Sequence, residues 1–380
     1  MSDPNREKKG RILSGMRPTG KLHLGNYVGA LRNWVRLQDD YDCFFFIADW
    51  HALTTDYADT RNIKQNSLEV MIDYLAAGLD PERSTMFIQS HVPQHAELHL
   101  LFSMITPLGW LERVPSYKEQ RENIKDKDLS TYGFLGYPLL QSADILMYQA
   151  NFVPVGEDQV PHVELTREVA RRFNQFYPLG KHAIDFTEPL EPGSPYSFPT
   201  KQRPHQKYQK MFVFPEPKPL LTPASKLPGT DGRKMSKSYG NTILLSEPEA
   251  SLRAKLKTMV TDPARIRRSD PGNPDVCPVG DLHKIFSSSD TMSKVYDGCR
   301  TAGIGCIECK KWAADSLWDV LAPIQERRAK YEAEPKLAWD LLEAGSAKAR
   351  MAAESTMEEV RAAANLSFEY EPPKQDIEDK

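Results

Sequence analysis

The chain has 380 residues, a formal net charge of −3, 40% apolar and 27% charged residues, an ordinary composition for a globular protein of two or three domains. No apolar run approaches the roughly 18 residues of a membrane span, and the charged start MSDPNREKKG excludes a secretory signal. We therefore expect a cytoplasmic protein without a membrane partner. The slightly acidic balance excludes a globally basic protein, so a nucleic acid would need a local patch such as ARIRRSD at 264–270.

Short apolar runs alternate with helical periodicity in the first part of the chain. The expected elements are a run at Arg11–Ser14, the turn-rich loop GMRPTG at 15–20, a helix at Leu24–Trp34, the strand CFFFIA at Cys43–Ala48, a helix near Asn62–Gly78 and a run at Thr85–Ile88. This order predicts an α/β fold with a doubly wound parallel sheet. Ligands of such sheets bind at the carboxyl ends of the strands, where the 15–20 loop and Asp49–His51 would lie.

The composition and periodicity of the sequence change after residue 180. Lys181–Gly232 is rich in proline and weakly periodic, as functional or mobile segments often are. After Ser246 the pattern is mostly helical, and its last helix, near Ser346–Asn365, would be capped by Ser346. We predict a Rossmann-like domain at 1–246, an all-helical domain at 247–367 and a disordered acidic tail at 368–380.

Two loops have the composition of phosphate-binding loops. PTGKLHLGN at Pro18–Asn26 would lead from a strand into a helix, whose free N–H groups attract anions, although an ordinary turn would look the same. His23 and Asn26 are three residues apart and can face one ligand. RKMSKSYGN at Arg233–Asn241 offers two ammonium groups, Lys234 and Lys237, although such a pair is usually only a solvated surface. The two loops together are more informative than either alone.

HLGN followed by KMSKS resembles the HIGH and KMSKS pair of class I aminoacyl-tRNA synthetases. KMSKS is matched at all five positions, and HLGN departs from HIGH at two. SGMRPTGKLHLGNYVGAL, YPLLQSADILMY and VPVGEDQVPHVELTRE resemble bacterial tryptophanyl-tRNA synthetases, and the resemblance covers most of residues 11–367. It implies a homodimer whose helical domain binds the anticodon. It also implies the reaction, in which ATP with Mg²⁺ activates L-tryptophan as tryptophanyl-adenylate for transfer to tRNA(Trp).

The resemblance also implies the residues of the ATP site. They are Arg17, Pro18, Thr19, His23, Gly25, Asn26, Gly156, Glu157, Asp158, Lys234, Met235, Ser236, Lys237 and Ser238. Lys234, Lys237, His23 and Asn26 would be catalytic, with the lysines on the leaving pyrophosphate and Asp158 on the ribose. The family usually has Gln and Ser where Arg17 and Thr19 stand.

The tryptophan pocket needs an acceptor for the indole N–H, and a carboxylate is the strongest choice. Asp144 lies in the apolar stretch SADILMY, where its neighbours favour burial. The resemblance implies that Asp144 accepts the indole N–H and that Tyr137 and Gln159 hold the α-amino group. The rest of the implied pocket is His51, Gln141, Val153 and Val155.

The spacing Y-x3-Q-x2-D of Tyr137, Gln141 and Asp144 is also the one that tyrosyl-tRNA synthetases use, so the pocket alone leaves tyrosine open. GEDQ and the cysteine pattern favour tryptophan. A nucleotidyltransferase that does not act on tRNA is a second alternative, disfavoured by KMSKS and the long helical C-terminus. A non-catalytic iron–sulfur protein that binds RNA or senses redox state is a third, disfavoured by the intact motifs.

Four of the five cysteines have the spacing of a metal site. Cys277, Cys299, Cys306 and Cys309 read C-x21-C-x6-C-x2-C, which suits tetrahedral zinc or a 4Fe–4S cluster. A subset of bacterial tryptophanyl-tRNA synthetases carries a C-x22-C-x6-C-x2-C cluster motif, so the resemblance implies the cluster, with zinc as the alternative. The cluster would recognise tRNA, sense redox state or support the fold. Cys43, in the apolar strand, is expected in the core.

Overall fold

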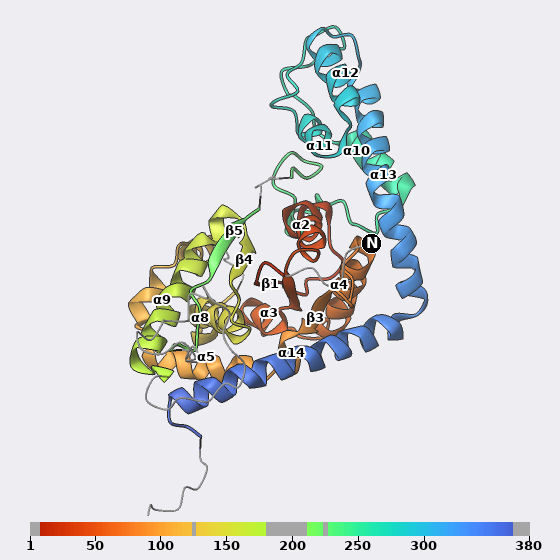
Figure 1. Cartoon of the computed structure of the whole chain (residues 1–380). Helices are drawn as coiled ribbons and strands as arrows, with labels where there is room; N and C mark the ends of the chain where they lie inside the picture. The colour runs from red at the N-terminus through yellow and green to blue at the C-terminus, as the bar shows by residue number, and fades with distance from the viewer. Residues whose placement is uncertain (1–7, 124–126, 180–210, 223–226, 368–380) are drawn as a thin grey trace, which may run out of the picture.

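The computed structural model describes residues 8–123, 127–179, 211–222 and 227–367. Its centre is a five-stranded sheet in the order β3-β2-β1-β4-β5, and all four strand pairs are parallel (Figure 1). The strands are β1 (Arg11–Met16), β2 (Asp42–Ile47), β3 (Ser84–Ile88), β4 (Phe152–Val155) and β5 (Lys218–Leu221). The predicted doubly wound parallel sheet is confirmed. Most of the proline-rich segment and the predicted tail at 368–380 lie outside the described residues.

Helices connect and cover the strands. Before β5 they are α1 (Leu24–Asn26), the π-helical turn η1 (Tyr27–Leu31), α2 (Arg32–Leu37), α3 (Asp49–Asp56), α4 (Ile63–Ala77), α5 (Gln94–Ile105), α6 (Leu108–Glu112), α7 (Pro115–Asn123), α8 (Tyr132–Met147) and α9 (Val160–Phe176), with the 3-10 turns η2 (Gln89–His91) and η3 (Glu157–Gln159). After β5 come the 3-10 turn η5 (Lys237–Tyr239), then α10 (Glu249–Thr258), α11 (Pro278–Phe286), α12 (Ser289–Arg300), α13 (Cys306–Ala333) and α14 (Pro335–Ala363). No helix in the described ranges is both long and apolar enough to cross a membrane.

Strand β2 explains why CFFFIA is apolar at every position. Cys43, Phe45 and Ile47 face a core shared with α2, α4 and α13, and Cys43 is buried there as expected. Phe44 and Phe46 point to the opposite face, into a core shared with α5, α8, α9 and α14. Both faces of the sheet are therefore covered by helices, as a parallel sheet requires.

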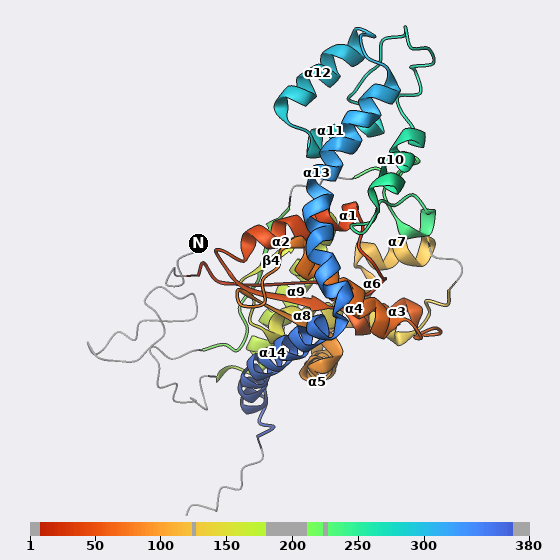
Figure 2. The same ribbon diagram turned by 90° about the vertical axis from the view of Figure 1, so that its right-hand side faces the viewer.

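The C-terminal helices pack against the sheet domain as well as against each other. The helical pattern after residue 246 is confirmed. Helix α13 runs from the α10–α12 region down to α4 (Figures 1 and 2), and α14 then packs along β3 and α5. The division of the chain between residues 246 and 247 stays a prediction.

The predicted cap at Ser346 is wrong. Helix α14 begins at Pro335, and Ser346 is a buried residue inside it. Its hydroxyl donates to the carbonyl of Leu342, four residues back, and accepts the backbone N–H of Ile88 at 3.2 Å. Because β3 is an edge strand, that N–H has no neighbouring strand to bind, and α14 covers the edge instead.

A glycine makes this close approach possible. A Cβ atom on Gly345 would lie 1.9 Å from the carbonyl oxygen of Met86 in β3. Neither backbone can yield without moving the helix off the strand. Gly345 is therefore the point at which α14 is fixed to the sheet.

We expect Gly345→Ala to lower the free energy of unfolding by about 1–3 kcal/mol or more, because overpacking here involves backbone rather than a side chain. Urea denaturation measures the change. Lys348→Ala, at an exposed position on the same helix, should shift the midpoint very little. Equal midpoints for the two variants would contradict the tight contact with Met86.

Candidate functional site

A cavity of about 360 Å³ opens at the carboxyl ends of the strands. Nine residues predicted from the sequence line it: Arg17, His51, Tyr137, Gln141, Asp144, Val153, Val155, Gly156 and Gln159. Further lining residues that the sequence analysis did not single out include Gly29, Phe46, Thr54, His162 and Thr222. The cavity therefore lies where the rule for doubly wound sheets predicts a ligand site.

Asp144 is the most constrained polar group of the cavity. Its carboxylate is 0% exposed, and its Oδ1 accepts hydrogen bonds from Gln89 Nε2 at 2.7 Å and His95 Nδ1 at 2.6 Å. Its Oδ2 lies 2.7 Å from His51 Nε2. Burial raises the pKa of Asp144, but His51 and His95 outweigh burial and hold the pKa well below its ordinary value. The group is thus an aligned anionic acceptor.

Sequence reasoning missed two partners of Asp144. Gln89 follows β3 directly, at the same carboxyl edge of the sheet as Asp49–His51, and His95 lies in the first turn of α5, the next helix along the chain. Their position after β3 was the feature of the sequence from which they could have been predicted. His95 also has its other ring nitrogen 2.8 Å from the Tyr148 hydroxyl. His95 thus links the Asp144 carboxylate to the Tyr148 hydroxyl through its two ring nitrogens.

A second polar chain lies at the same cavity. Tyr137 Oη is 2.6 Å from Ser116 Oγ, and Ser116 Oγ is 2.5 Å from His162 Nε2. His162 Nδ1 is in turn 2.6 Å from Gln141 Oε1. Gln159 stands beside this chain and donates its amide N–H to Asp158, which leaves its oxygen as an acceptor.

His23 and Asn26 bind each other rather than the cavity. His23 Nδ1 accepts the Gly25 N–H at 3.1 Å, and Asn26 Oδ1 accepts the His23 N–H at 3.1 Å. The pair forms a capping box that starts α1. Burial, and then the charge of Lys237, lowers the pKa of His23 to about 4, so the ring is neutral at physiological pH.

The structure brings the two motif loops together. Lys237 Nζ donates to the carbonyl of Thr19 at 2.7 Å and lies 3.3 Å from its hydroxyl. The segment after KMSKS pairs with the first loop, since Leu24 N–H donates to Ile243 and Leu245 N–H donates to Leu22. These two contacts join residues that are more than 200 positions apart.

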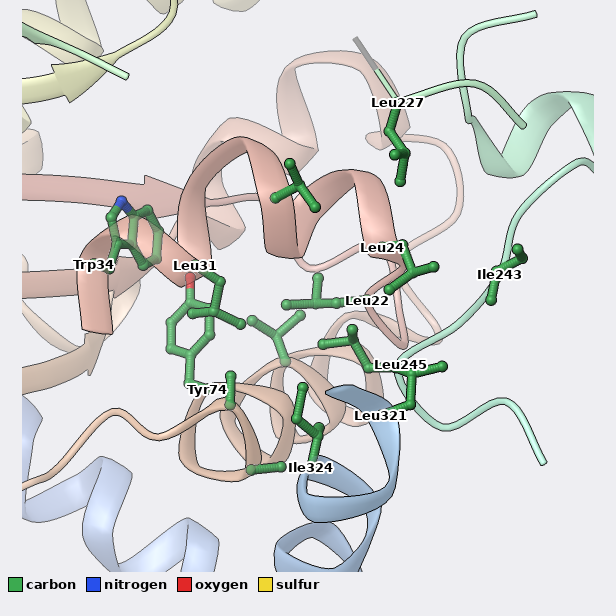
Figure 3. Packing of buried hydrophobic residues seen from close by; sticks show 14 of the residues in the cluster. Leu22, Leu24, Leu31, Trp34, Tyr74, Leu227, Ile243, Leu245, Leu321 and Ile324 are labelled. Carbon is green, nitrogen blue, oxygen red and sulfur yellow. The ribbon is translucent and has the colours of Figure 1, made fainter. Parts of the chain in front are cut away.

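Apolar side chains hold this pairing. Figure 3 shows Leu22 and Leu24 of the first loop beside Ile243 and Leu245, with residues of α13 completing the cluster. These α13 residues are Leu321 and Ile324. The loops are therefore anchored in the core that also carries the C-terminal helices.

The other predicted ATP-site residues have varied surroundings. Pro18 and Met235 are buried, whereas Thr19, Lys234, Ser238, Glu157 and Asp158 are exposed. Ser236 and Ser238 share a 2.8 Å hydrogen bond. Arg17 lines the cavity and donates to Asp56 at 3.0 Å, and burial lowers its pKa although Asp56 opposes the shift. Its Nε is buried without a hydrogen-bond partner.

The four predicted metal ligands lie at helix ends in one region. Cys277 precedes α11, Cys299 ends α12, and Cys306 and Cys309 form the first turn of α13. Burial, and then the charges of the other three cysteines, raise the pKa of Cys309 to about 12, so the four thiols lie close enough to interact. Arg265 Nη1 lies 3.8 Å from the sulfur of Cys299.

Four thiols are a suitable donor set for zinc or a 4Fe–4S cluster. Cys277, Cys306 and Cys309 lie at helix N-termini, and Arg265 lies near Cys299, two features that favour thiolates, whereas burial opposes them. The four cysteine side chains do not converge on one point as the ligands of a metal would. Within the described ranges, no three or more histidine, cysteine, aspartate or glutamate side chains are arranged to hold a metal ion. The residues of the metal site therefore share a region without forming a closed site.

Residues 5–322 match the sequence model of a protein family, the class I tRNA synthetases for tryptophan and tyrosine. The chain belongs to this family. Tryptophan–tRNA ligases from Ralstonia nicotianae and Thermotoga maritima are 51% and 52% identical to it, over 94% of this chain and 99% and 100% of their own lengths.

Solved structures of synthetases from this family are similar to the chain. The tryptophanyl-tRNA synthetase from Campylobacter jejuni, complexed with ADP and tryptophan, has a TM-score of 0.76 at 30% identity, covering 94% of this chain and 100% of that one. A tyrosyl-tRNA synthetase from Archaeoglobus fulgidus, at 20% identity and a TM-score of 0.57, shares the fold. The family resemblance read from HLGN and KMSKS is confirmed.

We expect the KM for ATP to be independent of the ionisation of His23 between about pH 6 and 8, because a pKa of about 4 keeps the ring neutral. The KM of the wild type and of His23→Gln, measured by ATP–pyrophosphate exchange, should then follow parallel pH profiles in this range. As the pH falls towards 4, only the wild type gains a positive charge here. A wild-type transition near the ordinary histidine pKa that His23→Gln lacks would contradict the burial of His23.

Proposed function

We propose that the chain is a tryptophan–tRNA ligase, which activates L-tryptophan with ATP and transfers it to tRNA(Trp). The observation that carries the proposal is the buried Asp144 carboxylate in the cavity. Its Oδ1 is bound by Gln89 and His95, whereas Oδ2 has only His51 and retains room for one more donor. An indole N–H is such a donor. Val153 and Val155 supply apolar wall for the ring.

The first step needs no catalytic base, because the tryptophan carboxylate is already a nucleophile. Its oxygen attacks the α-phosphorus of ATP, and the bond to the leaving pyrophosphate breaks. The task of the protein is alignment and charge stabilisation. Lys234 and Lys237 hold the pyrophosphate, with Mg²⁺ sharing its charge. Arg17, His23, Gly25 and Asn26 position the nucleotide, and Asp158 takes the ribose hydroxyls.

The ammonium group of tryptophan needs acceptors. Tyr137 and Gln159 both line the cavity, and the Gln159 oxygen is left available by the bond from its amide to Asp158. His51 and Gln141 complete the polar wall. The second step moves the aminoacyl group from the adenylate to a ribose hydroxyl at the tRNA 3′ end.

The proposal includes one surface for the tRNA and another for a second subunit. Near Cys306, a groove carries Arg265, Arg267, Arg268 and Lys311. Beside these charges, Ile266 and Ile307 are 86% and 73% exposed, which suits an anticodon with unstacked bases. The exposed apolar residues Leu100, Met104, Leu108 and Tyr132 support a homodimer. A cytoplasmic location stays a prediction.

We further propose that Cys277, Cys299, Cys306 and Cys309 hold a 4Fe–4S cluster, with zinc as the alternative. Their coupling and the neighbouring Arg265 support this. A cluster bound there would add a redox-sensitive structural centre. Because the cysteines belong to α11–α13 and the ATP loops to the sheet domain, a catalytic role for the cluster is not part of the proposal.

We expect the wild type to catalyse ATP–pyrophosphate exchange with tryptophan and not with tyrosine. Lys237→Ala should reduce the exchange rate by about 100-fold or more, because it removes charge stabilisation in the transition state, and should leave tryptophan binding nearly unchanged. Lys257→Ala, an exposed lysine at the end of α10, is the control for loss of a charge. Exchange with tyrosine, or normal exchange by Lys237→Ala, would contradict these assignments.

We expect protein purified without oxygen to be brown and to contain about four irons per chain. Cys309→Ser should lose the iron, since one thiolate ligand is missing. Cys43→Ala changes the one cysteine outside the motif and should keep it. A colourless protein with one zinc per chain, lost in Cys309→Ser, would favour the zinc alternative and exclude the cluster.

A further inference from the structure

The polar chain from Gln141 to Tyr137 has one direction of proton donation. The Gln141 oxygen can only accept, so His162 Nδ1 carries the hydrogen of their 2.6 Å bond. His162 is buried and neutral, since burial, and then the charge of His51, lowers its pKa to about 4. Its Nε2 therefore has a free lone pair and accepts the Ser116 proton across 2.5 Å.

The same direction of proton donation extends from Ser116 to Tyr137, which lines the cavity. Ser116 has one proton, which goes to His162, so its oxygen must accept the proton of Tyr137 across 2.6 Å. The Tyr137 hydroxyl then has no proton left for the cavity and presents only lone pairs. An ammonium group carries only donors and needs such an acceptor.

Turning the Gln141 amide over would reverse every bond of the chain. Its N–H group would donate to His162 Nδ1, His162 Nε2–H would donate to Ser116, and Ser116 would donate to Tyr137. The Tyr137 proton would then point toward the ligand and oppose an ammonium group. The orientation of one amide thus decides whether this side of the cavity accepts or donates.

We propose that Gln141, His162 and Ser116 are positioning residues that keep Tyr137 an acceptor for the α-ammonium of the substrate. The proposal rests on the proposed function, since it concerns the amino-acid side of that site. Three helices supply the chain: α7 holds Ser116, α8 holds Tyr137 and Gln141 one turn apart, and α9 holds His162 in its first turn. A 5.7 Å T-shaped contact between the Tyr137 and His162 rings fixes their relative position.

The test compares two ligands that differ only in the ammonium group. L-tryptophan carries it, and indole-3-propionate is the same acid without it. By calorimetry, Ser116→Ala should bind tryptophan about tenfold more weakly, because a hydrogen bond to a charged group is impaired. Its affinity for indole-3-propionate should equal that of the wild type. A general distortion of the cavity would weaken both ligands alike and would overturn the proposal.

Two further variants complete the test. Gln141→Met removes the acceptor that sets the direction and should also weaken tryptophan selectively, so the proposal does not depend on the folding of one variant. Ser142→Ala is the matched control, because the Ser142 hydroxyl bonds Thr166 between the same helices α8 and α9 and does not line the cavity. It should bind both ligands as the wild type does. Unchanged tryptophan affinity in Ser116→Ala would also overturn the proposal.

A double-mutant cycle tests whether Ser116 affects tryptophan binding only through Tyr137, as the polar chain requires. In a Tyr137→Phe background, Ser116→Ala should have no additional effect on tryptophan affinity, since Ser116 acts only through the Tyr137 hydroxyl. If the losses of tryptophan affinity in the two single variants added up in the double variant, the proposed polar chain would be overturned. Failure of the proposed function is a different result: the wild type itself would then neither bind tryptophan nor support exchange.

Discussion

A single buried carboxylate fixes the position of the first motif loop. Asp73, on α4, is 0% exposed and binds two distant groups, the Leu22 backbone N–H at 2.6 Å and the Arg328 guanidinium from α13. Burial raises the pKa of Asp73 to about 6 even though Arg328 and the Leu22 N–H oppose the rise. For Arg328 the balance is reversed, because Asp73, Glu69 and Glu332 raise its pKa despite its burial. A buried ion pair of this kind holds its partners in place and is weak evidence for added stability. The loop that carries His23 therefore has its place only when α4 and α13 are packed together.

The apolar cluster around Leu22 extends this constraint to the second loop. Ile243 and Leu245 pack beside Leu22 and Leu24, and Leu321 and Ile324 of α13 close the cluster (Figure 3). The backbone of both loops is thus held from the inside, while Lys234 is exposed and Lys237 is half-buried beside Thr19. This division suits a site that must grip a polyphosphate, because flexible lysine heads on a fixed backbone can follow the charge without moving the loop. It also ties the C-terminal helices mechanically to the ATP side of the site.

The sequence was sufficient for features that are local or periodic. CFFFIA at 43–48 became a central strand because a parallel sheet is apolar on both faces, and Asp144 was buried because its helix neighbours are apolar. Ser346 was misread because its partner is Ile88, more than 250 residues away, and no local pattern distinguishes a helix cap from a serine that covers a strand edge. The partners of Tyr137 were missed for the same reason, because these hydrogen bonds join three helices whose packing only the folded chain defines. Gln89, by contrast, could have been placed near Asp144 by its position just after β3.

The two sides of the site answer different physical requirements. Selecting one amino acid needs buried polar groups that are already aligned and that a wrong ligand leaves unpaired, and in the proposed function the bonds of Asp144 and Tyr137 would provide this alignment. The leaving pyrophosphate gains charge during the reaction and must leave the protein afterwards, which in the proposed function would suit a lysine on a loop, such as Lys237. Lys237 donates to the neutral carbonyl of Thr19. A phosphate oxygen is a charged and therefore stronger acceptor, so ATP would replace this bond at little cost. The Lys237–Thr19 bond could thus give way to a phosphate oxygen while Asp73 and the apolar cluster keep the loop backbone in place.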